Sequence, residues 1–243
     1  MKDLTLITCS YETPIVTETM LKSYVYKHGP GPHNVVVMEN SRDNRTVEIL
    51  ETNRIPYVRT PGAGHSQSVD TALKICGTRY ALLVDTDIIF NSNIEFLYRK
   101  FRSNNYALMG QVCGSRAGFN LYTRVHPWFC FIDVEQTGKF NFHDQVRIDA
   151  TDSNVFYTSC PLTHRTEQKR YDVGATFFED VHKAGMKIGN LKPDPNIYVH
   201  YEGMSWYKNA NFDIFQNMVK EKDAEYKKHV EFLRSISIKG CYR

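Results

Sequence analysis

Apolar segments that are too short for buried helices alternate with helical segments along the first third of the chain, and no other feature constrains the fold as much. The predicted strands, rich in aliphatic and β-branched residues, cover residues 4–9, 35–38, 56–59 and 80–84. Between them, residues 15–27, 46–53 and 66–76 have the apolar spacing of helices. This order predicts an α/β protein whose central sheet is mainly parallel, flanked by helices and connected by right-handed crossovers.

The remainder of the chain is less regular. We predict strands at residues 107–112, 128–134 and 197–200, and helices at residues 172–184, before Gly185, and at residues 212–235. Residues 140–159 are polar and aromatic without a clear period, which indicates a loop-rich segment. No repeat or linker divides the sequence, so we expect one domain over residues 1–243.

Composition limits the partners, the cysteine chemistry and the cellular location that we expect for the protein. The net charge of +3 comes without a basic stripe, which argues against a nucleic-acid partner. None of the six cysteines belongs to a Cys-x-x-Cys pair, so we expect small buried thiols rather than disulfides or zinc ligands. No signal peptide or transmembrane segment is recognisable in the sequence. We therefore expect a cytoplasmic protein, and we leave peripheral attachment to a membrane open.

The fourth predicted strand ends in two carboxylates, Asp85 and Asp87, with Thr86 between them. Buried acids need a cation, a partner or water, and carboxylate oxygens are ligands that Mg²⁺ and Mn²⁺ prefer. The motif alone is weak, because a chain with 14 aspartates in 243 residues contains about one Asp-x-Asp pair by chance. An exposed turn after a strand is the alternative interpretation.

Polar residues also follow the first two predicted strands. Thr8, Ser10 and Tyr11 end the first strand, and Glu39 and Asn40 end the second. Because the carboxyl ends of parallel strands share one edge of a sheet, these side chains and the two aspartates are expected together, where open α/β sheets bind ligands. Tyr11 suits stacking on a base, and Glu39 and Asn40 suit ribose hydroxyls, although each alone is more often an ordinary loop residue.

A glycine-rich segment, residues 61–66, precedes the third predicted helix. Glycine lets the backbone approach a ligand closely, and a helix N-terminus offers N–H groups to an anion, to which His65 could add a donor for a phosphate. The alternative is a glycine-rich turn in which Ser66 caps the helix.

The candidates in the second half each have two interpretations. His200 ends the last predicted strand and is either a metal ligand or a structural histidine. Asp172 is either the general base for an acceptor hydroxyl or a helix N-cap. Glu179 and Asp180 are rival bases, but they lie inside the predicted helix and we expect them to be solvated. Further candidates are His126 and Trp128, which could hold a sugar ring, while Trp128 could equally belong to the core.

Together these residues resemble the GT-A glycosyltransferases, in particular the inverting family 2 enzymes. The segments that carry the resemblance occur in the same order as in that family's nucleotide-binding half. They are residues 8–11, residues 37–41, His65 before a helix, and residues 83–87, Leu-Val-Asp-Thr-Asp. It implies a GT-A fold, in which residues 1–110 bind the nucleotide sugar and residues 111–243 bind the acceptor. Two departures are Glu39, where many relatives have Asp, and the Glu179-Asp180 pair, which is displaced from Asp172.

The activity implied by this resemblance is metal-dependent transfer of a sugar from a nucleotide-diphosphate sugar to a hydroxyl of a glycan or glycoconjugate, with inversion. Mn²⁺ or Mg²⁺ would bind Asp85, Asp87 and His200, and Asp172, which follows Tyr171, would be the catalytic base. The donor would contact Thr8, Ser10, Tyr11, Glu39, Asn40, His65, Asp85 and Thr86, and the acceptor would contact His126 and Trp128.

Two other functions remain open at the level of the sequence. A sugar-phosphate nucleotidyltransferase usually has a glycine-rich, basic phosphate loop early in the chain, and residues 10–14, Ser-Tyr-Glu-Thr-Pro, have neither property. A non-catalytic carbohydrate-binding protein would need no metal and no base, and its sugar binding would survive the loss of Asp85 and Asp87.

Overall fold

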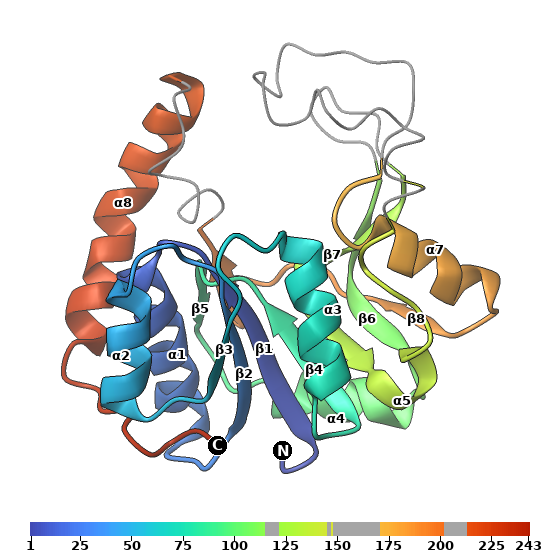
Figure 1. The fold of residues 1–243 in the computed structure, drawn as a ribbon, viewed down its shortest axis with the longest axis horizontal. Helices are drawn as coiled ribbons and strands as arrows, with labels where there is room; N and C mark the ends of the chain where they lie inside the picture. Colours follow the sequence, from blue (N-terminus) through green and yellow to red (C-terminus); the bar gives the residue numbers. More distant parts are fainter. Residues whose placement is uncertain (115–121, 145–146, 148–170, 202–212) are drawn as a thin grey trace.

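The central sheet of the protein has helices on both of its faces (Figure 1). The structure is a computed structural model, and it describes residues 1–114, 122–144, 147, 171–201 and 213–243. Among these residues, none of the helices combines the length and the apolar composition that crossing a bilayer requires.

The first seven elements confirm the predicted alternation, and each boundary lies within one residue of its prediction. They are β1 (Leu4–Ser10), α1 (Pro14–His28), β2 (Asn34–Glu39), α2 (Arg45–Asn53), β3 (Tyr57–Arg59), α3 (His65–Ile75) and β4 (Tyr80–Val84). Pro14 occupies the first turn of α1, where its missing N–H group has no acceptor within the helix in any case. Local sequence pattern is therefore sufficient to define this half of the sheet.

The second half contains elements that the sequence pattern did not reveal. It comprises β5 (Ile88–Phe90), α4 (Glu95–Ser103), β6 (Leu108–Cys113), β7 (Arg124–Asp133), α5 (Val134–Thr137), α7 (Ala175–Lys183), β8 (Ile188–Asn190), β9 (Tyr198–His200) and α8 (Asp213–Leu233). The three-residue strands β5 and β8 are too short to show a period, and α4 was also missed. The predicted loop-rich segment falls largely on residues 145, 146 and 148–159, which lie outside the described residues.

The strand order of the seven-stranded sheet is β3-β2-β1-β4-β7-β6-β8. Strands β1, β2, β3 and β4 are parallel to their neighbours, and β8 is parallel to β6. Only β7 runs in the opposite direction, antiparallel to β4 and to β6. The prediction of a mainly parallel sheet is thus confirmed. A separate antiparallel pair, β5 with β9, lies beyond the end of β4.

Strand β4 shows why the sheet is buried on both faces. Its alternate side chains enter two different cores: Leu82 and Val84 pack into one, and Ala81 and Leu83 into the other. Helices α1 and α4 complete the first core, and α3 and α7 complete the second. A continuous apolar strand is typical of a sheet covered by helices on both sides. With both faces covered, the carboxyl edge of the strands is where polar side chains can gather.

Candidate functional site

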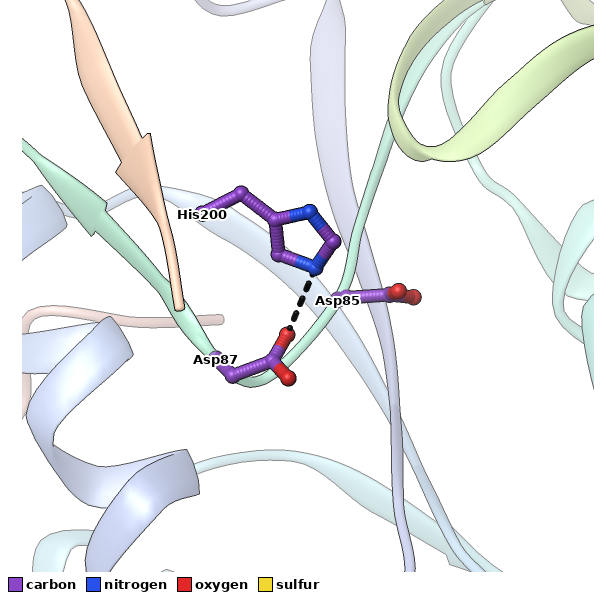
Figure 2. A group of neighbouring side chains, drawn as sticks. All are labelled: Asp85, Asp87 and His200. Carbon is purple, nitrogen blue, oxygen red and sulfur yellow. Dashed lines mark ion pairs between the residues drawn. The ribbon is translucent and has the colours of Figure 1, made fainter. Parts of the chain in front are cut away.

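Three side chains that could bind a metal ion converge just beyond β4. One ligand atom from each of Asp85, Asp87 and His200 lies within 4.8 Å of the others, and His200 Nε2 is 3.2 Å from Asp87 Oδ1 (Figure 2). The β5–β9 pair explains this convergence, because Ile88 and His200 are partners in its ladder. The Tyr201 N–H group also donates to the Asp87 carbonyl oxygen at 2.9 Å, which fixes the end of β9 against the aspartates.

The donor set of this cluster fits a hard divalent cation. Asp87 is only 1% exposed, whereas Asp85 and His200 are half-buried, so the cluster has a buried floor and an accessible side. Two carboxylates and one imidazole match the preferences of Mn²⁺ and Mg²⁺ sites that share an ion with a substrate phosphate. It is also the one group of three or more such donors in the part of the chain that the structure describes.

Electrostatic effects of the aspartates reach neighbouring groups. Burial, with a further contribution from Asp85, raises the pKa of the Cys9 thiol well above its usual range. Burial also raises the pKa of Tyr226 on α8, and the charge of Asp87 adds to that shift. Helix α8 therefore lies near the buried aspartate, and its Glu225 accepts a hydrogen bond from Tyr201 Oη at 3.1 Å.

An irregularity in β7 brings Trp128 to the cluster. In the β6–β7 ladder Gly110 pairs with Cys130 and Val112 pairs with Val125, so residues 126–129 lie opposite Gln111 alone. Pro127, which lacks an N–H group, lies within this bulge, a position where strands tolerate proline. Bulges re-aim side chains, often near functional sites. A Cβ atom on Gly110 would lie 2.9 Å from the Phe129 carbonyl oxygen, so only glycine permits this close approach.

The bulge forms an aromatic wall beside the metal-binding candidates. The Trp128 carbonyl oxygen accepts a hydrogen bond from the Asp85 N–H group at 3.0 Å. The ring of Trp128 lies 4.7 Å from that of His200 and is stacked on His126 at 3.6 Å. The structure thus brings both acceptor-side candidates to the same place as Asp85, Asp87 and His200.

The polar residues that end β1 and β2 lie at the predicted edge, and most of them are buried. Thr8, Ser10, Glu39 and Asn40 are at most 4% exposed. Ser10 Oγ is 2.8 Å from Thr17 Oγ1, the Asn40 amide donates to Ser68 Oγ at 2.9 Å, and Glu39 Oε1 accepts from the Ser41 N–H group at 2.9 Å. Their hydrogen bonds hold the edge together, which the sequence pattern did not indicate.

The more accessible candidates at this edge are Tyr11, His65 and Asp85. Tyr11 is 38% exposed, and His65 is half-buried as the first residue of α3. The N-cap of α3 is Gly64, whose N–H group donates to Gln67 Oε1 at 3.3 Å, so the alternative in which Ser66 caps this helix is wrong. Thr86 is only 2% exposed and lies between the two aspartates.

Asp172 is held by a residue that sequence reasoning missed. Its carboxylate forms an ion pair with the guanidinium of Arg124, a 6%-exposed residue at the start of β7, and accepts the Val173 N–H group at 2.7 Å. Helix α7 begins after Gly174, whose φ of 81° favours glycine, so the N-cap interpretation of Asp172 is wrong. Arg124 is two residues before His126 on the same strand, a polar alternation that could have revealed it.

The rival bases on α7 belong to a different cluster. Arg147 pairs with Glu179 at 3.1 Å and with Asp180 at 2.7 Å, and its Nε also contacts Asp144 at 2.6 Å. Both α7 acids remain about one-quarter exposed, and Arg147 holds each of them in an ion pair. Asp144, Arg147 and Asp180 line a polar cavity of about 320 Å³, together with Lys139, Phe140, Asn141 and His143.

Comparison with known proteins adds independent findings. The model of the family described as "Glycosyl transferase family 2" matches residues 5–171, more than two-thirds of the chain. Residues 1–349 of S. aureus TarS are similar in structure, with 15% identity over 91% of this chain and 70% of that one, and a TM-score of 0.55. A mannosyltransferase from Pyrobaculum calidifontis, solved with GDP-Man and Mn²⁺, has 12% identity over 98% and 85% and a TM-score of 0.49. A search of curated proteins found no match.

Proposed function

This chain belongs to glycosyl transferase family 2, and from this membership we propose that it transfers a sugar from a nucleotide-diphosphate sugar to an acceptor hydroxyl, with a divalent metal ion and with inversion. The observation that carries the proposal is the cluster of Asp85, Asp87 and His200 at the carboxyl edge of the sheet. Open α/β sheets bind their ligands at this edge.

Asp85, Asp87 and His200 would hold Mn²⁺ or Mg²⁺. When bound, such an ion neutralises the negative charge that develops on the leaving nucleotide diphosphate. The buried Asp87 provides a fixed ligand, and the half-buried Asp85 and His200 leave one side open for phosphate oxygens. Pairing of β9 with β5 keeps His200 in place before a ligand arrives.

The donor nucleotide would lie along the ends of β1 and β2 and the start of α3. Tyr11 offers an exposed ring for stacking on the base, and His65 offers a donor to a phosphate. No described residue hydrogen-bonds to Thr8 Oγ1, Glu39 Oε2 or His65 Nε2, although all three atoms are buried. Buried polar atoms of this kind normally have partners, which a bound nucleotide would supply. Ser10, Asn40 and Thr86 would act mainly by shaping the edge.

The acceptor would lie against the wall of His126 and Trp128. Asp172 would take the proton of the acceptor hydroxyl while that oxygen attacks the anomeric carbon and the bond to the diphosphate breaks on the opposite face. Arg124 holds the Asp172 carboxylate in one orientation. In this arrangement residues 1–110 bind the donor and residues 111–243 the acceptor, except that His200 comes from the second part to complete the metal site.

The direct test is a donor screen. Purified protein is mixed with UDP, GDP and their common sugar conjugates, with Mn²⁺ or with EDTA, and thermal unfolding is followed, because a ligand that binds only the folded state raises the apparent melting temperature. We expect stabilisation by one nucleotide class only when Mn²⁺ is present, and slow hydrolysis of the matching nucleotide sugar. Hydrolysis at full rate in EDTA would refute the metal dependence.

A further inference from the structure

We propose that Cys113, at the end of β6, is a reactive thiol that His126 activates, and that it is a site of covalent modification by soft electrophiles. The Cys113 Sγ atom contacts His126 Nε2 directly. Cys113 is half-buried, whereas His126 is only 2% exposed. A thiol in contact with an imidazole can transfer its proton to the ring and become the nucleophilic thiolate.

A guanidinium lies beside this pair. Cys113 and Arg124 are direct partners across the β6–β7 ladder, where opposite side chains are close neighbours. The β6–β7 ladder and the sulfur contact place Arg124 and His126 beside Cys113, and the segment before α7 brings Asp172 to Arg124. Asp172 is engaged by Arg124, while His126 faces the sulfur atom. Reactive cysteines typically occupy partly exposed sites next to cationic side chains.

The other described cysteines lack this environment. Cys9 lies near the negative Asp85, and burial together with that charge raises its pKa. Cys130 is fully buried, which also raises its pKa. Cys241 is buried as well, and Cys76 packs against the second hydrophobic core, with the hydroxyl and carbonyl oxygens of Thr78 as its hydrogen-bond partners. Cys76 is half-buried like Cys113, and it is therefore the matched comparison within the same protein.

The reaction with iodoacetamide shows how the step balances. The Cys113 thiolate attacks the CH₂ carbon, a sulfur–carbon bond forms, and iodide leaves with the electron pair of the broken carbon–iodine bond. The proton of the thiol passes to His126 and then to solvent. The adduct would lie beside His126, which stacks on Trp128, whose ring neighbours His200. Modification is therefore expected to disturb the wall beside the proposed metal site.

The experiment measures alkylation of each cysteine separately and needs no enzymatic turnover, so its outcome is independent of the proposed function. Protein carrying Cys160→Ser, which removes the one cysteine outside the described residues, is treated with limiting iodoacetamide at pH 7 and its peptides are quantified by mass spectrometry. We expect Cys113 to react about tenfold faster than Cys76, with a half-maximal rate below the pH of about 8.5 typical of a free thiol.

The variant His126→Gln in the same background tests the source of the reactivity. We expect it to slow alkylation of Cys113 about tenfold and to leave that of Cys76 unchanged. Equal rates for Cys113 and Cys76 in the unaltered site would overturn the proposal, as would a rate at Cys113 that His126→Gln does not change. If that variant unfolds, the pH–rate profile of Cys113 decides alone: a midpoint at or above that of Cys76 refutes the activation.

Discussion

The two sides of the proposed site are built by different kinds of contact. On the donor side, helices α1 and α2 connect β1, β2 and β3 in sequence order, and β2 pairs with both β1 and β3. On the other side, β9 brings His200 to Asp87 over more than 100 residues, and Asp172 meets Arg124 across a long stretch of chain. The donor side is thus defined by local sequence pattern. The metal-binding candidate His200 and the proposed base Asp172 are instead positioned by contacts between distant segments. Four experiments test this difference between the two sides.

The largest effect is expected at the point where the two sides meet. The substitution Asp87→Asn removes a buried carboxylate that contacts His200 at 3.2 Å. We expect sugar transfer at saturating Mn²⁺ to fall about a thousandfold, equivalent to about 4 kcal/mol, because the charge on the leaving diphosphate would no longer be neutralised. Steady-state kinetics with Mn²⁺ titration provide the measurement.

The matched control is Asp3→Asn, at the opposite edge of the sheet. Asp3 is a partly exposed partner of Arg102 at 3.3 Å, and its loss is expected to leave transfer unchanged. If Asp87→Asn retained full activity while both variants folded, the cluster would be structural and the donor would be bound without its help.

The second experiment concerns Asp172 and Arg124. We expect Asp172→Asn to lower kcat about a hundredfold, the lower end of the contribution of a general base, while nucleotide binding is retained. The substitution also leaves the buried guanidinium of Arg124 without its carboxylate, which can cost about 3–5 kcal/mol of stability. Kinetics and urea unfolding must therefore be measured together.

A double variant separates the two causes. Arg124→Met combined with Asp172→Asn removes the unpaired charge, so stability should recover while kcat stays low. Recovery of kcat in the double variant would show that Asp172 acts only through folding. A larger loss from Asp180→Asn than from Asp172→Asn would place the base on α7, where Arg147 now holds that carboxylate at 2.7 Å.

The third experiment tests the stability of the donor side through His28, in the last turn of α1. Its Nδ1–H group donates to the Tyr24 carbonyl oxygen at 2.7 Å, and its Nε2 accepts the Ile94 N–H group at 3.0 Å. Burial lowers the pKa of His28 from 6.5 to about 4. Between these values the unfolded chain binds a proton that the folded protein excludes, so stability is complete above pH 6.5 and falls as the pH drops toward 4.

We expect this one group to remove about 2.5 kcal/mol from the free energy of unfolding between pH 7 and pH 4.5. Urea unfolding at both pH values measures it as the difference between the wild type and His28→Gln, which cannot titrate. The control is His182→Gln, which replaces an exposed histidine on α7 by the same residue and should leave the free energy of unfolding at pH 7 unchanged. An identical pH dependence in His28→Gln and the wild type would contradict the assignment.

Sequence reasoning was most accurate for the boundaries of consecutive elements, and it missed most of the contacts that distant segments make with one another. The helix of residues 65–75 and the strand of residues 80–84 were predicted within one residue, because their apolar spacing is set by the faces they bury. Asp85 and Asp87 were identified from the end of that strand. Arg124 was missed, because its alternation with His126 was a weak sign and an arginine at a strand start is ordinary until Asp172 is known to face it. The bulge at residues 126–129 likewise depends on the β6–β7 register, of which Pro127 was the one local sign.

The smallest effect is expected for Trp128, whose ring lies beside His126 of the proposed acceptor wall and beside His200 of the proposed metal site. If its ring holds the acceptor sugar, Trp128→Leu should raise the acceptor KM about tenfold, equivalent to about 1.4 kcal/mol, with the donor KM and the Mn²⁺ requirement unchanged. Trp128→Phe, which keeps an aromatic ring, should lose less. If the ring instead positions His200, which lies 4.7 Å away, Trp128→Leu should weaken activation by Mn²⁺ and leave the acceptor KM unaltered. Kinetics with acceptor and Mn²⁺ varied independently distinguish the two roles, because only the first places an acceptor contact on the bulge of β7.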